Sequence, residues 1–158
     1  MVEWSIVSPM PKRESPLESQ TLEVRDFPGY RREKFVFQSR PGSWVLGYLL
    51  TPTKGKAPHA TVICVPGHGR GVDDIVGIDE KGADRGDKRE GYQYDFAIQA
   101  TEHGMAALAI EPMGFGCRRD ERNKRNLTQS ACQPVAGAAL LLGQTMIGWR
   151  VWDVRAPG

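Results

Sequence analysis

The chain has 158 residues, 40% of them hydrophobic and 25% charged, which is an ordinary composition for one globular domain around one core. Its 21 basic and 19 acidic residues leave a net charge of +2, so the charge gives no reason to expect nucleic acid or an anionic membrane as a partner. The three cysteines, Cys64, Cys117 and Cys132, follow no disulfide spacing, and we therefore expect a cytoplasmic protein with reduced, buried thiols.

The first 20 residues are predicted to form an extended arm. Pro9, Pro11 and Pro16 stand among charged residues there, and proline interrupts regular structure. The acidic residue Glu3 and the lack of a continuous apolar segment argue against a secretory signal. The folded domain is therefore expected over residues 21–158.

Three strands are predicted to follow, in the segments TLEVRDF (21–27), REKFVFQS (32–39) and SWVLGYLLTP (43–52). Apolar and polar residues alternate along them, as they do in strands with one buried face. Pro-Gly pairs separate the segments at 28–29 and 41–42, and such pairs favour tight turns. The second and third strands are therefore expected to form an antiparallel hairpin.

The next two strands have a different character. HATVICVPG (59–67) and GMAALAIEP (104–112) contain short, continuous apolar runs, which are typical of parallel strands covered on both faces. The order of elements is then antiparallel strands followed by β-α-β-α. This order predicts an α/β fold.

Two helices are predicted in this second part. The first, YQYDFAIQATEHG (92–104), places Tyr94 and Ile98, with Ala97 more weakly, on one face, and Gly104 ends it. The second runs from about residue 129 to 154. Its apolar stretch is interrupted by polar residues and is shorter than the ~20 apolar residues that a bilayer requires, so it is expected to be a buried helix and not a membrane span.

Two charged segments are predicted to be solvated surface loops. The acidic segment DDIVGIDEKGADRGDKRE (73–90) does not match the spacing of a calcium-binding loop, and we expect no metal site there. The segment RRDERNKRN (118–126) mixes acids with its bases and contains no aromatic residue, which argues against a phosphate or nucleic-acid site.

A glycine turn follows the first apolar strand, in the sequence TVICVPGHGRG. In α/β sheets ligands bind beyond the carboxyl ends of the strands, which is where Gly67, His68 and Gly69 are expected to lie. Glycines there allow backbone N–H groups to approach a developing negative charge, as an oxyanion hole requires. From spacing alone an ordinary glycine-rich turn is the simpler interpretation.

A second glycine turn, in EPMGFGCRR, follows the second apolar strand and is expected at the same edge of the sheet. Its functional interpretation is the wall of a substrate pocket, and the alternative is a tight exit from a buried strand. The residues predicted to form the wall are Glu111, Met113, Gly114, Phe115 and Gly116.

Several blocks occur in an order that resembles a known family. The blocks VPGHGRGVDDIVGID, YQYDFAIQATEHGMAALAIEPMGFG and ALLLGQTMIGWRVWD are similar to the N-terminal half of α/β-hydrolases of the dienelactone-hydrolase-like and acetyl-xylan-esterase-like branch. The resemblance covers residues 30–154 and departs at Pro66, where relatives often have histidine. It implies hydrolysis of a small carboxylic ester through a serine or cysteine acyl-enzyme, without a cofactor or metal, and it implies that the N–H of His68 donates to the oxyanion.

The resemblance also implies what this sequence lacks. Such hydrolases carry the nucleophile in a G-x-S-x-G turn, followed by the acid and the histidine, and no such turn occurs here. The strand that would carry this turn pairs, by the same resemblance, with TVICV, so an open sheet edge is expected. We therefore predict self-association or a partner chain that completes the sheet. Two alternatives stay open: a non-catalytic binding or assembly module, and a truncated product without activity by itself.

Overall fold

The computed structural model describes residues 16–86, 88–89, 93–124 and 131–156. The predicted arm therefore falls mostly outside the described residues. The elements are five strands, β1 (Gln20–Phe27), β2 (Tyr30–Arg40), β3 (Ser43–Pro52), β4 (Thr61–Cys64) and β5 (Ala106–Ile110), four α-helices, α1 (Phe96–Glu102), α2 (Glu121–Lys124), α3 (Cys132–Leu141) and α4 (Met146–Arg155), and two 3₁₀ turns, η1 (Val72–Ile75) and η2 (Gly116–Arg118).

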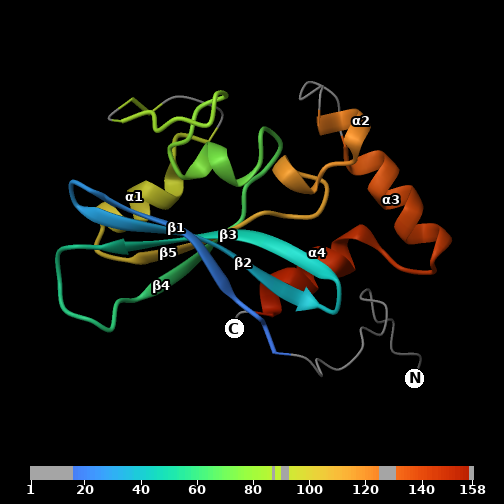
Figure 1. Cartoon of the computed structure of the whole chain (residues 1–158), viewed down its shortest axis with the longest axis horizontal. Coiled ribbons are helices and arrows are strands. Elements are labelled where there is room, and N and C mark those ends of the chain that lie inside the picture. The colour runs from blue at the N-terminus through green and yellow to red at the C-terminus, as the bar shows by residue number, and fades with distance from the viewer. Residues whose placement is uncertain (1–15, 87, 90–92, 125–130, 157–158) are drawn as a thin grey trace.

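The strands form one mixed sheet in the order β1-β2-β3-β5-β4 (Figure 1). β1 pairs antiparallel with β2, β2 with β3, and β3 with β5, whereas β5 and β4 pair in parallel. The predicted hairpin is present, and its turn is made by Pro41 and Gly42, where Gly42 has the positive φ of 74° that favours glycine. The predicted α/β fold class, antiparallel at its start and parallel afterwards, is confirmed.

Each face of the sheet has its own apolar core. Tyr48, Leu50 and Cys64 lie on one face and pack with α1 and η1, while Phe37 and Val45 lie on the other face and pack with Ala156 at the end of α4. The alternation of side chains along a strand explains the division, since neighbouring residues point to opposite faces. The two cores place α1 and α4 on opposite sides of the sheet.

The predicted first helix is shorter than its sequence pattern suggests. Tyr94 and Asp95 have positive φ angles of 49° and 53°, so α1 begins only at Phe96. Tyr94 is 62% exposed, and its expected place on the buried face is wrong, whereas Ala97 is fully buried. Gly104 ends the helix as predicted, with a φ of 78° and an N–H that donates to the carbonyl of Thr101 at 3.0 Å.

The single long helix predicted over residues 129–154 is wrong, because the chain forms α3 and α4 instead. Gly143, with a φ of 66°, ends α3, and its N–H donates to the carbonyl of Leu140 at 2.9 Å. Thr145 then begins α4, since its hydroxyl accepts the N–H of Gly148 at 3.0 Å. The expected burial is also wrong for α3, where Leu141 is 90% exposed. None of the helices in the described part of the chain has the length and apolar character to cross a membrane.

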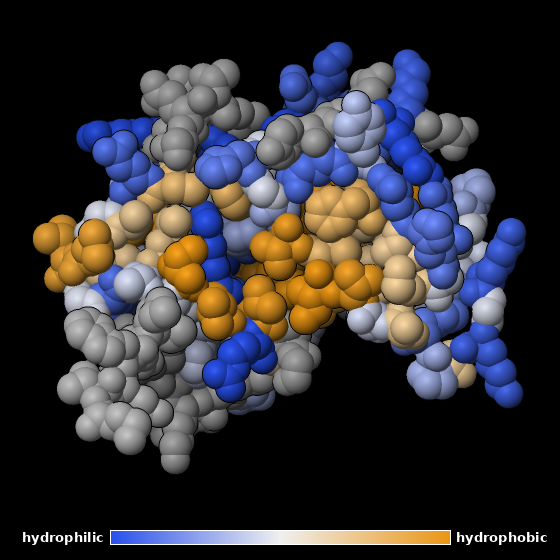
Figure 2. Space-filling model, turned by 180° about the vertical axis from the view of Figure 1, so that it is seen from behind, coloured by the Kyte–Doolittle hydropathy of each residue, from blue (hydrophilic) through white to orange (hydrophobic). Residues whose placement is uncertain are grey.

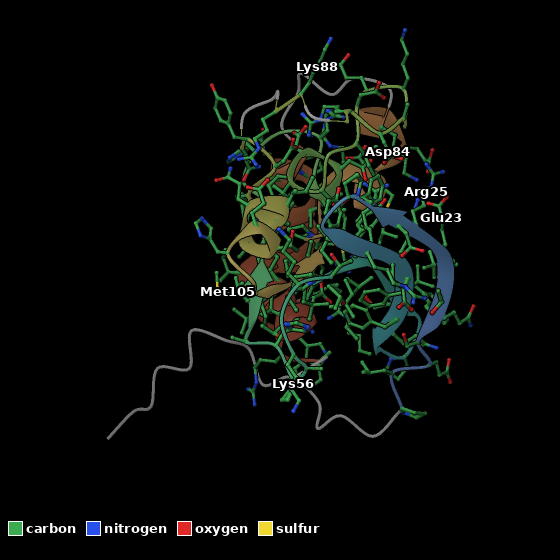
Figure 3. The ribbon with its side chains drawn as sticks, turned by 90° about the vertical axis from the view of Figure 1, so that its left-hand side faces the viewer. Glu23, Arg25, Lys56, Asp84, Lys88 and Met105 are labelled. Carbon is green, nitrogen blue, oxygen red and sulfur yellow. The ribbon has the colours of Figure 1, made fainter. Side chains whose placement is uncertain are left out.

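Charged side chains join the outer strand β1 to the loop that precedes α1. Arg25 lies between Glu23 and Asp84 and makes an ion pair with each, at 2.6 and 2.7 Å (Figure 3). Asp84 also pairs with Arg32, whose guanidinium is buried. These contacts, which bridge residues far apart in sequence, attach the loop to the sheet.

Candidate functional site

The two glycine turns lie side by side beyond the carboxyl ends of β4 and β5. Because these strands are parallel neighbours, the turns that follow Cys64 and Ile110 leave the same edge of the sheet. The His68 ring meets the edge of the Phe115 ring at a centroid distance of 5.7 Å. The structure therefore brings the residues predicted from the two turns together.

The first turn lies at the surface of the molecule. Gly67 and His68 are exposed and Gly69 is half-buried, with a φ of 141°. The N–H of Gly67 donates to Oε1 of Gln93 at 2.9 Å, whereas the N–H of His68 donates to none of the residues that the structure describes.

The buried Asp74 supports this turn from below. One of its oxygens accepts the backbone N–H of Arg70 at 2.8 Å, and the other pairs with the guanidinium of the same residue at 2.6 Å. A Cβ at Gly69 would overlap this carboxylate, so only glycine fits there. Arg119 adds a hydrogen bond to the Gly69 carbonyl at 2.7 Å.

Glu111 lies beneath both turns and is only 1% exposed. Its Oε1 accepts the N–H of Val72 at 3.2 Å, and a Cβ at Gly71 or at Gly116 would overlap the carboxyl group. Burial raises the pKa of Glu111 to about 8, although the N–H groups of Val72 and Cys117 act in the opposite direction. The carboxyl therefore contacts the backbone of both turns, and the predicted wall residue is a group buried beneath the surface.

The rest of the second turn is held by α4. Arg150 donates two hydrogen bonds to the Met113 carbonyl, at 3.0 and 2.7 Å, and its guanidinium lies 4.6 Å from the centre of the Phe115 ring. Gly114, with a φ of 85°, is buried beside the same guanidinium. The second turn is thus fixed by contacts to both the first turn and α4.

A buried polar network lies behind the site and was not predicted. Asp153 accepts hydrogen bonds from the hydroxyl of Ser39 at 2.6 Å and from Arg118 at 2.5 Å. Arg118 also donates to the Glu111 carbonyl at 3.1 Å. The prediction that residues 118–126 form a solvated loop is therefore wrong for Arg118 and Arg119, which are largely buried. The prediction of a solvated loop over residues 73–90 is wrong for Asp74, which is also buried.

The three thiols differ in their burial, and a cavity lies apart from the two turns. Cys64 is buried, but Cys117 is exposed, which corrects the prediction of three buried thiols. No group of three potential metal ligands gathers anywhere in residues 16–86, 88–89, 93–124 and 131–156. A cavity of about 460 Å³ lies between the β1-β2 turn and α1, and its lining includes Phe27, Tyr30, Arg32, Asp84 and Glu102. None of the predicted site residues lines this cavity.

Sequence comparison places the chain in a family. The sequence profile of the Abhydrolase family matches residues 5–152, which is nearly the whole chain. The chain belongs to this family. It is therefore a member of the α/β-hydrolase superfamily, as the resemblance in its blocks implied. No curated protein sequence matches it significantly.

One solved structure has the same fold over most of this chain. A putative acetyl xylan esterase from Bacteroides fragilis NCTC 9343 matches 92% of this chain with a TM-score of 0.74 at 22% identity. An acetyl xylan esterase from Paenibacillus sp. R4 matches 65% of the chain at 26% identity with a TM-score of 0.41, and a cold-adapted esterase from an Arctic intertidal metagenomic library matches 76% at 17% identity with a TM-score of 0.40. The chain spans 37%, 28% and 47% of these proteins, respectively, so it corresponds to less than half the length of each.

Proposed function

We propose that this chain supplies the oxyanion-binding turn, with Gly67, His68 and Gly69, and part of the substrate pocket of a carboxylic-ester hydrolase. In this proposal the nucleophile, the acid and the catalytic histidine come from residues outside this sequence. Membership of the Abhydrolase family supports hydrolysis as the parent activity. The names of the similar structures support an ester as the substrate class.

One observation carries the proposal: His68 is exposed at the carboxyl edge of a parallel strand pair, and its N–H donates to none of the residues that the structure describes. Negative charge that develops on a carbonyl oxygen is stabilised by donors already fixed in place. The buried carboxyl groups of Asp74 and Glu111 accept the N–H groups of Arg70 and Val72, and Asp74 also lies against Gly69. The turn is therefore held in place before the charge appears.

A small phosphonate tests the proposal on the chain as it exists, because its tetrahedral anion resembles the oxyanion. In an NMR titration of the ¹⁵N-labelled chain, methylphosphonate is expected to shift the amide signals of Gly67, His68 and Gly69 with a millimolar dissociation constant. The neutral dimethyl ester of the same phosphonate is the matched control and should leave these signals in place. A response that is the same for both compounds, or absent from the turn, would contradict the proposal.

Three variants sharpen this experiment. His68→Ala should retain the response, since the donor is a backbone N–H. Gly69→Ala should lose it, because the new Cβ would overlap Asp74 at a φ that disfavours other residues. The control is Gly42→Ala, which creates similar backbone strain in the hairpin turn, where the new Cβ has open space around it. This variant should retain the response to methylphosphonate.

A second candidate function is assembly through the sheet edge, where β4 pairs with no other strand of the described part than β5. By strand alternation Ile63 and Val65 lie on the α4 face, yet each is 43% exposed. Ile147 and Val151 of α4 are also exposed, at 54% and 39%. Figure 2 shows apolar side chains gathered across the middle of the molecule as seen from behind. An open apolar edge favours pairing with another strand.

For this candidate we take a second copy of the chain as the occupant, and a different partner chain is an outcome of the test. Light scattering after gel filtration should show a dimer or larger species for the wild type and a monomer for the double variant Ile63→Lys, Val65→Lys. A wild type that stays monomeric at every concentration would contradict self-association and leave a different partner chain as the remaining occupant.

A further inference from the structure

The oxyanion role proposed above requires that the first turn keep one conformation, and the buried group that contacts both turns is Glu111. We propose that Glu111 is a positioning residue, whose carboxyl joins the turn after β4 to the turn after β5 and thereby fixes where His68 presents its N–H. The effect on oxyanion binding rests on the proposed function. The joining of the two turns can be tested separately.

The contacts of the carboxyl are divided between the two turns. Oε1 accepts the N–H of Val72 and lies against Gly71, both of which follow β4. Oε2 lies against Gly116, which follows β5, and the nearby N–H of Cys117 favours the charged form of the carboxyl and so lowers its pKa. A side chain that touches the backbone of two separate loops restricts both of them.

The glycines on either side make this contact possible. Gly71 and Gly116 have φ angles of 94° and 43°, and neither position has room for a Cβ next to the carboxyl. Their positive φ angles bring the backbone of each turn close to one group. Two separate turns therefore have backbone conformations that suit the same carboxyl.

The position of Glu111 at the end of β5 explains why it reaches both turns. Its N–H donates to the Leu46 carbonyl at 2.9 Å, which continues the pairing of β5 with β3, and its own carbonyl accepts from Arg118. The backbone is thus anchored to the sheet, while the side chain extends beneath the turns. Movement of either turn away from the sheet would leave a buried carboxyl without its hydrogen bonds.

Burial, with smaller contributions from nearby charges, determines how the carboxyl responds to pH. Asp73 favours the protonated form, and Arg118 favours the charged form. The thiol of Cys117, whose own pKa is raised, also lies nearby. Burial outweighs these groups and raises the pKa of Glu111, so the group changes its charge near neutral to mildly alkaline pH.

Hydrogen exchange and NMR test the inference on the intact chain. In Glu111→Gln the new side chain keeps one acceptor oxygen and loses the other. The hydrogen-exchange rate of the Val72 or Cys117 backbone N–H is therefore expected to rise at least tenfold, and the backbone amide signal of His68 is expected to move. The control, Asp84→Asn, removes a carboxylate that pairs with Arg25 and Arg32, and it should leave these signals unchanged. Exchange within twofold of the wild type, together with an unmoved His68 signal, would overturn the inference.

A second measurement needs no variant and covers the case in which Glu111→Gln does not fold. In the wild type, the ¹³C signal of the Glu111 carboxyl should titrate together with the amides of Val72 and Cys117, along one curve. Independent titration of the two turns would overturn the inference.

The phosphonate titration separates this inference from the proposed function. If the exchange rates rise as expected but methylphosphonate does not bind, Glu111 joins the turns and the oxyanion role fails. If methylphosphonate binds the wild type and Glu111→Gln with equal affinity and unchanged exchange, the oxyanion role stands and the positioning role fails. A Glu111→Gln variant with both faster exchange and at least fivefold weaker phosphonate binding supports both.

Discussion

The pH dependence of folding stability provides a quantitative test of the buried Glu111. An ordinary glutamic acid has a pKa of 4.5, and burial raises that of Glu111 to about 8. Because the folded state then binds this proton more tightly than the unfolded state, the contribution to stability is complete below pH 4.5 and is lost as the pH rises through about 8. Each pKa unit corresponds to about 1.4 kcal/mol, so from about pH 5 to about pH 8.5 this group alone should lower the free energy of unfolding by about 4 kcal/mol.

The assay is urea unfolding followed by far-UV circular dichroism at several pH values, for the wild type and for Glu111→Gln. Other groups titrate in both proteins, so the quantity of interest is the difference between the two free energies of unfolding. This difference should change by about 4 kcal/mol across the range, in the direction that favours the variant at high pH. Parallel profiles would refute the reasoning, because they would show that Glu111 has the same pKa in the folded and unfolded chain.

Three further perturbations follow from the same contacts. Gly71→Ala should destabilise the chain by about 3 kcal/mol, since a Cβ would overlap Glu111, whereas Gly42→Ala should cost only about 1 kcal/mol; equal urea midpoints would contradict this. Asp153→Asn should cost about 3 kcal/mol in urea unfolding, because it leaves the Arg118 guanidinium buried without its ion pair, and a loss below about 1 kcal/mol would count against that. The single variant Ile63→Lys should weaken self-association at least tenfold, as measured by sedimentation equilibrium, and should leave the midpoint of urea unfolding unchanged. Unaltered self-association would exclude the open sheet edge as the contact.

Local patterns were sufficient to predict the strands. The alternation in SWVLGYLLTP predicted a strand over 43–52, and β3 has these bounds. The Pro-Gly pair at 41–42 predicted the hairpin turn, because a tight turn depends on a few adjacent residues. The apolar runs around Cys64 and Ala107 predicted parallel strands covered on both faces. β4 and β5 do pair in parallel, but β4 is covered on one face only, since Ile63 is 43% exposed. The strand bounds and the hairpin turn depend on a few adjacent residues, so the local sequence was sufficient to predict them.

The errors in the helices arose where competing local signals were present. Gly143 and Thr145 are residues that commonly end and begin helices, yet the apolar character of the surrounding segment favoured one long helix. Tyr94 has helical spacing from Ile98 but a positive φ, which no periodicity reveals. Attention to capping residues would have divided the last helix correctly.

The polar network could not be predicted because its partners are distant in sequence. Arg118 pairs with Asp153, 35 residues away, and Asp153 bonds to Ser39, 114 residues away. In the sequence Arg118 belongs to a charged run that is typical of a solvated surface. The proximity of the glycine turns was predictable from the parallel strands, but the inward position of Glu111 depends on Gly71 and Gly116 approaching it in space.

The central claim is that this chain presents an oxyanion-binding turn without the nucleophile that would use it. Labelling with a fluorophosphonate, read by intact mass on a sample whose near-UV circular dichroism shows a folded protein, tests this claim most directly. Serine hydrolases take up one such group on the activated serine. The account predicts a folded chain with no stoichiometric adduct. One adduct per chain would contradict it, and peptide mapping would then identify the residue that acts as the nucleophile.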